Sequence, residues 1–179
     1  MQRWRVPLGF LCAVIFLIFS RPRPLTLAMG AAIALPGLAI RAWASGYLRK
    51  NDALATSGPY AYTRNPLYLG SLIMGLGFTV AANRLVLGLV FAGLFLGIYL
   101  PVMRVESATL AQLFGKTYQR YAQAVPALLP RLTPYHGGTG QQQKFDASLY
   151  SRYREYQAAL GFVVTWILLV MKAFYFKQL

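Results

Sequence analysis

The stretch LYLGSLIMGLGFTVAANRLVLGLVFAGLFLGIYLPVM, residues 67–103, decides the fold. It consists of two apolar runs, Leu67–Ala82 and Leu85–Met103, with only Asn83 and Arg84 between them. Long apolar runs are typical of helices in a bilayer, because a helix satisfies its own backbone hydrogen bonds there. The short link therefore predicts an antiparallel pair of transmembrane helices. The glycines expected to let these two helices approach each other closely are Gly70, Gly75, Gly77, Gly88, Gly93 and Gly97.

The composition of the whole chain agrees with a membrane location. Of its 179 residues, 57% are hydrophobic and 12% are charged, and soluble domains carry about twice that charged fraction. The apolar runs are continuous, whereas a transmembrane β-barrel needs short segments of alternating polarity. The sequence therefore predicts an all-α integral membrane bundle that forms a single domain over residues 1–179.

Three further apolar spans bring the expected number of transmembrane helices to about five. They cover about Val6–Ser20, Leu25–Ser45 and Ala158–Phe174. The first span could be mistaken for a secretory signal. It is followed by Arg21-Pro22-Arg23-Pro24 instead of a small-residue cleavage site, so we expect it to be a retained anchor.

The chain is strongly basic, with 18 Lys and Arg against 4 Asp and Glu and a net charge of +14. The basic residues are scattered between apolar spans, which argues against nucleic-acid binding and favours contact with anionic membrane lipids. Most of them fall on the side of the N-terminus, so the positive-inside rule predicts a cytoplasmic N-terminus, in a bacterial inner membrane. Arg41 lies inside a span and is expected to snorkel to the surface or to contact a lipid headgroup. With Cys12 and His136 as the only cysteine and histidine, we expect no metal site.

Two segments have the pattern of helices that lie along the cytosolic membrane face. Glu106–Val125 has apolar residues at three- and four-residue spacing and ends at Pro126. Lys144–Gln157 is rich in Tyr and Arg, which is typical of an interfacial helix. We expect residues 144–179 to form this interfacial helix and the fifth transmembrane helix.

Two long polar segments stand where short turns would suffice. The first, Asp52–Gly70 (DALATSGPYAYTRNPLYLG), carries Arg64, Asn65 and three tyrosines, and the second runs from Arg104 to Pro130. Long loops of this kind usually have a functional role. Because the third and fourth spans form a hairpin, the end of the first segment should meet the start of the second. We therefore expect one site built from both segments at the cytosolic face.

Glu106 is the candidate for chemistry that is hardest to explain otherwise. It is the only acidic residue between Asp52 and Asp146, and it lies at the end of a bilayer span, where an unpaired carboxylate is costly. An ion pair with Arg104 or Arg64 is the structural interpretation. Contact with a cofactor is the functional one.

The two polar segments also carry motifs that are similar to those of a known family. The first contains GPY at 58–60 and RNPLYLG at 64–70, which resemble the pattern G-x-Y followed by R-H-P-x-Y-x-G. The second contains ESATL at 106–110, FGKTYQRY at 114–121 and VPALLP at 125–130, which resemble E-E-x-x-L, F-G-x-x-Y-x-x-Y and V-P-x-x-x-P. These motifs resemble the isoprenylcysteine carboxyl methyltransferase and phospholipid methyltransferase family of integral membrane methyltransferases.

The resemblance implies that residues 52–130 form a methyltransferase-like core. Such a core would bind S-adenosylmethionine and methylate a lipophilic small molecule or a lipid. Matching positions imply that Glu106 contacts the cofactor and that Arg104 acts on the acceptor, so these two are the candidate catalytic residues. The residues implied to bind the cofactor are Asp52, Ala53, Leu54, Ala55, Tyr60, Arg64, Asn65, Pro66, Leu67, Tyr68 and Glu106.

The chain departs from the family pattern at Asn65, where His is usual, and at Ser107, where a second Glu is usual. Asn can hydrogen-bond but does not titrate near pH 7. Methyl transfer from an activated donor depends on alignment more than on acid–base groups, so both departures are compatible with catalysis.

Two alternatives stay open. One is an NADPH-dependent membrane reductase similar to the sterol reductases, although Pro66–Ser71 lacks the Glu that is typical of that group. The other is a non-catalytic membrane scaffold, which the two departures would permit. The sequence indicates no protein partner.

Overall fold

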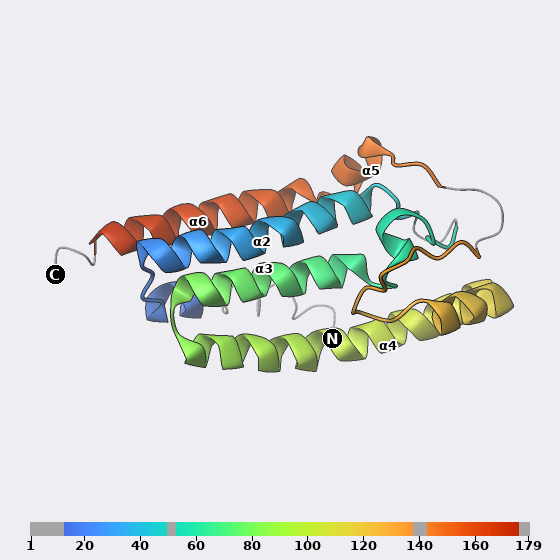
Figure 1. Cartoon of the computed structure of the whole chain (residues 1–179), viewed down its shortest axis with the longest axis horizontal. Helices are drawn as coiled ribbons and strands as arrows, with labels where there is room; N and C mark the ends of the chain where they lie inside the picture. Colours follow the sequence, from blue (N-terminus) through green and yellow to red (C-terminus); the bar gives the residue numbers. More distant parts are fainter. Residues whose placement is uncertain (1–12, 50–52, 138–142, 176–179) are drawn as a thin grey trace.

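The computed structural model describes residues 13–49, 53–137 and 143–175, and these residues contain no strand. Residues 13–19 are helical, and the elements after them are α2 (Pro24–Ser45), the 3-10 helix η2 (Gly58–Ala61), α3 (Pro66–Ala82), α4 (Leu85–Ala124), α5 (Ala147–Arg152) and α6 (Tyr156–Tyr175). The four long helices lie side by side along the long axis of the molecule (Figure 1). The predicted all-α bundle is confirmed.

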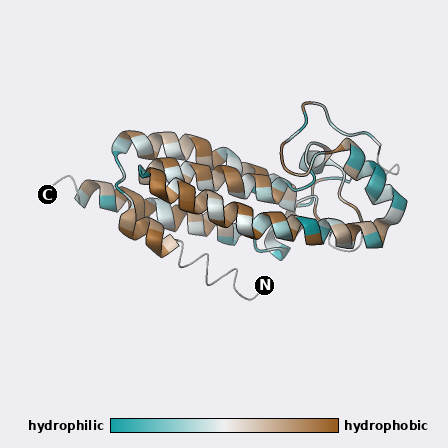
Figure 2. Ribbon diagram, turned by 90° about the horizontal axis from the view of Figure 1, so that it is seen from below, coloured by the Kyte–Doolittle hydropathy of each residue, from teal (hydrophilic) through white to brown (hydrophobic). Residues whose placement is uncertain are grey.

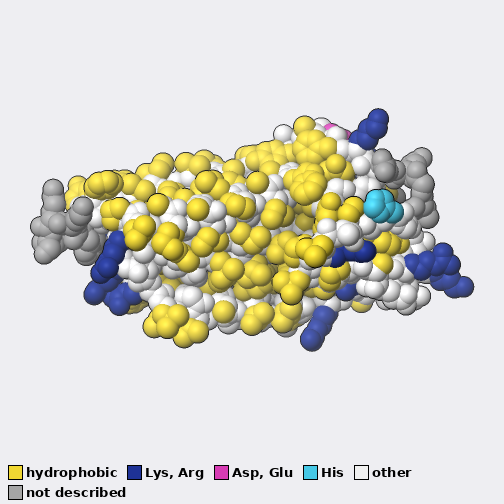
Figure 3. All heavy atoms as spheres, in the orientation of Figure 1, with side chains coloured by type: hydrophobic (Ala, Val, Ile, Leu, Met, Phe, Trp, Pro, Cys, Tyr) yellow, Lys and Arg dark blue, Asp and Glu magenta, His cyan; other side chains and the backbone are white. Residues whose placement is uncertain are grey.

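The outer surface of the bundle is that of a membrane protein. Helices α2, α4 and α6 are long and apolar enough to cross a bilayer, and α3 is a shorter apolar helix of 17 residues. Hydrophobic side chains cover the middle of the molecule, and Lys and Arg gather toward its ends (Figure 3). Such a wide apolar surface is suited to lipid and not to water. The chain is therefore an integral membrane helical bundle.

Four of the five predicted spans correspond to α2, α3, α4 and α6. The start of the first predicted span, about Val6–Ser20, lies outside the described residues, as does Cys12. The link between α3 and α4 is the predicted pair Asn83 and Arg84. Asn83 adopts a left-handed conformation with φ 51°, which Asn tolerates better than most residues and which ends α3 within one residue.

The polar segments gather at one end of the bundle. Helices α2 and α4 run toward this end, whereas α3 and α6 run away from it, so residues 53–65 meet residues 125–137 there (Figure 1). Hydrophilic residues are concentrated in the last turns of α4 and in the loops around them (Figure 2). The predicted convergence of the two polar segments is confirmed.

The closest packing in the bundle joins α2 to α3. A Cβ atom added to Gly77 would lie 2.5 Å from the carbonyl oxygen of Gly30 and 2.6 Å from the Cβ of Ala34. At the other end of this contact, a Cβ on Gly70 would lie 2.6 Å from the carbonyl oxygen of Gly37. Small residues at these positions let the two backbones touch, which is the usual way for helices to associate in lipid.

The predicted close packing of α3 on α4 is wrong. Open space surrounds Gly93 and Gly97 of α4, with no atom within 4 Å of an added Cβ, and Gly75 of α3 faces the ring of Phe91. The reason is that the small residues of α3 find matching small residues on α2, while bulky aromatic side chains hold α4 at a greater distance.

The helix predicted for Glu106–Val125 is present, and its apolar residues Leu110, Phe114, Tyr118 and Tyr121 lie in one cluster. It does not begin as a separate helix, because the residues from Glu106 to Gly115 continue the transmembrane helix. Helix α4 begins at Leu85, runs past Glu106, and has non-helical backbone angles only at Gly115 (φ 49°, ψ −126°). No glycine or proline lies between Pro101 and Gly115, so nothing in the sequence ends the helix at the membrane surface. Gly115 can adopt this left-handed conformation without steric cost and redirects the last turns of α4.

The C-terminal segment agrees with its prediction in part. Helix α5 covers only part of the predicted interfacial helix Lys144–Gln157. Its N-cap is Asp146, whose side chain accepts a hydrogen bond from the backbone N–H of Ser148 (2.9 Å). A turn at residues 153–155 follows. Helix α6 then contains the whole of the predicted span Ala158–Phe174.

We predict that Gly77→Ala destabilises the bundle. The added methyl group would collide with backbone and side-chain atoms of Gly30 and Ala34, and overpacking of this kind costs about 1–3 kcal/mol. Thermal unfolding in detergent, followed by loss of the monodisperse peak in gel filtration, should occur at a lower temperature than in the wild type.

Gly97→Ala is the matched control, because a Cβ at this position meets open space. Alanine also has the higher helix propensity, so the unfolding temperature should stay the same or rise. Equal stability of Gly77→Ala and Gly97→Ala would contradict the close contact of α2 and α3.

Candidate functional site

The loop before α3 is held in place by the chain that follows α4. The backbone N–H of Arg64 donates to the carbonyl of Pro126 (2.9 Å), that of Arg131 to Tyr62 (2.9 Å), and that of Tyr135 to Ala61 (3.0 Å). Thr63 is buried, and its hydroxyl donates to the carbonyl of Leu128 (3.0 Å). These bonds satisfy backbone groups that lie outside any helix, and they fix the two polar segments as one unit.

Tyr60 stands at the centre of this unit. It lies in η2, which begins at Gly58 with φ 59° and continues with Pro59. Its ring is 7% exposed, and its carbonyl accepts a hydrogen bond from the hydroxyl of Tyr121 (2.7 Å). Burial, together with the nearby carboxylates of Glu106 and Glu155, raises the pKa of Tyr60 well above its usual value. The phenol therefore stays protonated and neutral at physiological pH.

Tyr68 and Glu106 join the two halves of the site. The Tyr68 hydroxyl, in the first turn of α3, donates a 2.7 Å hydrogen bond to Oε1 of Glu106 on α4. The ring of Tyr68 also packs edge-on against Tyr99 of α4, with 5.1 Å between the ring centres. The predicted meeting of Glu106 with the first segment is confirmed at Tyr68.

The ion pair with Arg104 or Arg64, which was the structural interpretation of Glu106, is not formed. Among the described residues, neither arginine forms a salt bridge with Glu106. Arg64 instead donates from Nη1 to the hydroxyl of Tyr118 (3.2 Å), and Arg104 is exposed. Because α4 continues as a helix, Arg104 and Glu106 stand two residues apart and point in different directions around it.

The two positions where the chain departs from the family pattern both have structural partners. The Nδ2 of Asn65 donates to the carbonyl of Ala127 (2.7 Å) and thus holds the start of α3 against the second segment. Ser107 forms a 2.7 Å hydrogen bond with the hydroxyl of Tyr118, the group that also accepts from Arg64. These bonds require neither a titratable imidazole nor a second carboxylate.

The remaining predicted cofactor residues surround Tyr60 or lie behind it. Ala55 and Leu67 pack in the same apolar cluster as Tyr60, Leu54 packs against Tyr118 and Tyr121 of α4, and Pro66 is fully buried at the start of α3. Ala53 is half-buried in the loop before η2. Asp52 lies outside the described residues.

An apolar cavity of about 530 Å³ opens beside Tyr68, within the range of small-molecule sites. Its walls come from residues 13–19, α3, α4 and α6, and they include Phe16, Phe91 and Leu169. The polar side chains of Tyr68 and Arg41 also line it. The space exists because α4 stands away from α3, where aromatic side chains and not glycines face the neighbouring helix.

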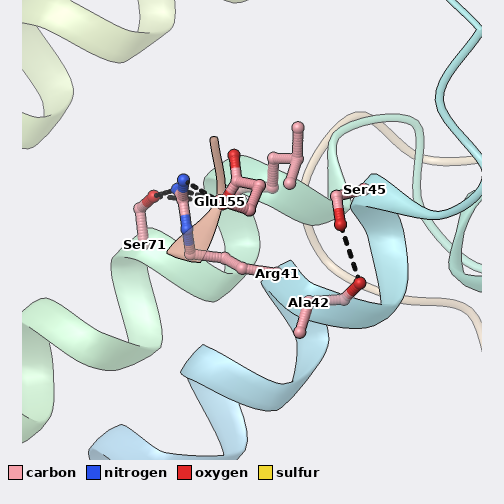
Figure 4. Close-up of polar contacts among 6 residues, drawn as sticks. Arg41, Ala42, Ser45, Ser71 and Glu155 are labelled. Carbon is pink, nitrogen blue, oxygen red and sulfur yellow. Dashed lines mark hydrogen bonds and ion pairs between the residues drawn. The ribbon is translucent and has the colours of Figure 1, made fainter. Parts of the chain in front are cut away.

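A polar cluster around Arg41 was missed by the sequence analysis. Arg41 donates from Nη2 to Oε2 of Glu155 (2.7 Å) and from Nη1 to the hydroxyl of Ser71 (2.6 Å), as Figure 4 shows. Arg41 therefore does not snorkel to the surface as expected, because it has a carboxylate partner inside the protein; the alternative, contact with a lipid headgroup, stays a prediction. One signal was available: an arginine within a span needs a partner, and Glu155 directly precedes the last span.

No candidate metal site is found in the part of the chain that the structure describes. No group of three or more His, Cys, Asp and Glu side chains is arranged there to hold a metal ion.

Comparison with known proteins places the chain among methyltransferases and metal-resistance proteins. The phospholipid methyltransferase family matches residues 26–117. A cobalt-zinc-cadmium resistance protein, CzcN, of Cupriavidus metallidurans is 38% identical over an alignment of 144 residues, and the match covers 75% of this chain and 65% of that protein. A protein-S-isoprenylcysteine O-methyltransferase of Schizosaccharomyces pombe is 33% identical over 81 residues, 45% of this chain and 34% of that protein.

A nickel-cobalt-cadmium resistance protein, NccN, of Alcaligenes xylosoxydans is 33% identical over 59% of this chain and 48% of its own length. The chain spans less than two thirds of the length of each of these relatives, and no solved structure matches it. The matched region contains η2, α3 and the Tyr68–Glu106 contact, so the motifs and their geometry agree with the comparison. This chain belongs to the phospholipid methyltransferase family of integral membrane proteins.

Proposed function

We propose that the protein uses S-adenosylmethionine to methylate a lipophilic acceptor at the cytosolic face of the membrane. The observation that carries the proposal is the contact of Tyr68 with Glu106 at the edge of an apolar cavity. This arrangement offers a polar place for a soluble methyl donor directly beside an apolar place for an acceptor that is dissolved in the bilayer. Membership of the methyltransferase family supports the same reading.

The residues around Glu106 fit the groups of S-adenosylmethionine. Its amino group would pair with the exposed carboxylate of Glu106, and its carboxylate would suit the guanidinium of Arg64. Aromatic faces attract cations, so the rings of Tyr60 and Tyr68 are suited to the sulfonium. When bound, S-adenosylmethionine supplies a methyl group that is already activated for transfer.

The chain contributes alignment and exclusion of water. The hydrogen bond from Tyr68 fixes the orientation of the Glu106 carboxylate, and the bond from Tyr121 fixes the backbone at Tyr60. The phenol of Tyr60 stays neutral, so it can donate a hydrogen bond but does not serve as a base. Displacement at an activated carbon needs the reacting atoms about 3–3.5 Å apart and in line, and a rigid site of this kind can hold them so.

The cavity is suited to the apolar part of the acceptor. It is lined by residues of several helices, and its walls are largely aromatic and aliphatic. An acceptor could enter from the bilayer and present its reactive atom at Tyr68. For location, we propose a bacterial inner membrane with a cytoplasmic N-terminus, because the site end of the bundle is rich in basic side chains.

We predict that Glu106→Gln weakens binding of S-adenosylmethionine without unfolding the protein. A lost charge-assisted hydrogen bond of about 1.5–3 kcal/mol corresponds to a dissociation constant about 10- to 100-fold higher. Isothermal titration of the detergent-solubilised protein measures this constant directly. Asp146→Asn is the matched control, since it removes a carboxylate outside the site and Asn can still cap α5; an equal effect of both substitutions would contradict the assignment of Glu106.

The same titration with NADPH separates the methyltransferase from the two alternatives. We expect heat with S-adenosylmethionine and none with NADPH. Heat with NADPH alone would indicate a reductase, and no heat with either would favour a scaffold.

We predict that Asn65→His retains binding of S-adenosylmethionine, whereas Asn65→Ala lowers the thermal stability. Histidine can still donate a hydrogen bond to the carbonyl of Ala127, and alanine cannot. The lost hydrogen bond should cost about 0.5–1.5 kcal/mol, visible as a lower unfolding temperature. Loss of cofactor binding in a folded Asn65→His protein would show that this position is not mainly structural.

A further inference from the structure

We infer that Arg41, and not Arg104, binds the polar head of the lipophilic acceptor, and that this head is an oxygen acid and not an amine. The inference rests on the proposed function in treating the occupant of the cavity as the acceptor. Its physical basis is the placement of a guanidinium at the polar end of an otherwise apolar cavity.

The charge that faces the cavity is positive. Of the described residues that line the cavity, Arg41 is the one that carries a charge, and Glu155 is not among them. The ion pair with Glu155 offsets part of this charge, but an ammonium head would still meet only N–H donors, to which it cannot form a hydrogen bond. An ionised oxygen acid would meet a donor of hydrogen bonds with the opposite charge.

The guanidinium of Arg41 is held firmly and still has donor capacity. Nη1 donates to the carbonyl of Leu67 (3.3 Å) and the hydroxyl of Ser71 (2.6 Å), and Nη2 donates to Glu155 (2.7 Å). Each Nη atom carries two N–H groups, so Nη2 can bind a second oxygen while it keeps Glu155. Arg41 can thus bind a head group without leaving its carboxylate partner unpaired.

The position of Arg41 relative to Tyr68 suits a head group at the reacting end. Arg41 bonds to the carbonyl of Leu67 and the side chain of Ser71, the residues that lie one before and three after Tyr68 on α3. Tyr68 lines the same cavity and bonds to Glu106. A head group bound by Arg41 would therefore lie next to the proposed methyl-donor site.

Glu155 serves as a positioning residue for Arg41. Its side chain is 12% exposed, and that of Arg41 is 20% exposed, so water screens the pair weakly. Glu155 follows Arg154, a residue with φ 56° that is unusual for a side chain other than glycine. This turn between α5 and α6 brings the carboxylate back onto Arg41 and keeps it away from the cavity.

Arg104 does not have these properties. It is exposed on α4, does not line the cavity, and forms no salt bridge within the described residues. The role that the family resemblance implied for Arg104 would therefore fall to a residue on a different helix.

The test uses the tryptophan fluorescence of the full-length protein in detergent. Trp166 stacks on Phe162 and packs against Phe78, which lines the cavity. With Trp4 and Trp43 replaced by Phe, a brominated chain that occupies the cavity should quench Trp166. The probes are dibromostearate and dibromostearylamine, used at a pH at which the acid is ionised and the amine is protonated.

We expect dibromostearate to quench Trp166 saturably, to be displaced by unbrominated stearate, and to bind at least about tenfold more tightly than the amine, a difference of about 1.4 kcal/mol. Arg41→Gln should abolish this preference, and Arg41→Lys should keep part of it because it retains the charge. Arg84→Gln is the control, since it removes an exposed arginine from the far end of the bundle. Its binding should equal that of the wild type.

Glu155→Gln separates a positioning role from simple electrostatics. Removal of a nearby negative charge would by itself tighten binding of an acid, whereas loss of the partner that orients Arg41 should weaken it. We expect several-fold weaker binding of dibromostearate, and tighter binding would contradict the positioning role.

Equal binding of the acid and the amine by the protein that has Trp166 as its single tryptophan and an intact Arg41 would overturn the inference, and this comparison needs no change at Arg41 or Glu155. A folded Arg41→Gln protein with an unchanged preference for the acid would also overturn it. Titration with S-adenosylmethionine on the same preparation keeps the two proposals apart. Quenching without cofactor binding would refute the methyltransferase alone, and cofactor binding without charge selectivity would refute the role of Arg41 alone.

Discussion

The close contact of α2 with α3 is the constraint on which the rest of the structure depends. In lipid, helices gain little from burying apolar side chains, so they associate where small residues let their backbones touch. Gly30 and Gly37 on α2 meet Gly77 and Gly70 on α3 in this way. The contact also determines the site: a Cβ on Gly70 would lie 2.6 Å from Cγ of Arg41, so only glycine lets Arg41 cross α3 to reach Ser71 and the carbonyl of Leu67.

Helix α4 does not pack through small residues, and the space that it leaves beside α3 forms the cavity. Gly93 and Gly97 face open space, and Phe91, Phe95 and Tyr99 form a row of stacked or tilted rings along the helix. These rings hold α4 away from α3 and leave an apolar volume that ends at Tyr68. Because α4 continues as a helix beyond the bilayer span, it also carries Glu106 to the hydroxyl of Tyr68. One helix therefore supplies both the wall of the cavity and the carboxylate of the site.

The polar end shows how a site can be assembled with few ionisable groups. Backbone hydrogen bonds between residues 61–64 and 126–135 hold the two polar segments together. Asn65 and Ser107 take part in this network through neutral hydrogen bonds, which explains how they can stand where the family usually has a histidine and a glutamate. The geometry demands hydrogen-bonding capacity at these positions and not a change of charge.

The sequence alone determined the class of the protein, the hairpin of α3 and α4, and the meeting of Glu106 with the first segment. Each of these follows from local properties: the length of an apolar run, a two-residue link, and spacing along the chain. The tertiary structure decided which helix packs against α3, whether the helix at Glu106 continues or starts anew, and which partner Arg41 takes. These choices depend on side chains far apart in sequence, since Glu155 lies 114 residues from Arg41. Local patterns do not encode such pairs, because many small residues could support a close contact between helices and more than one acidic residue could pair with Arg41.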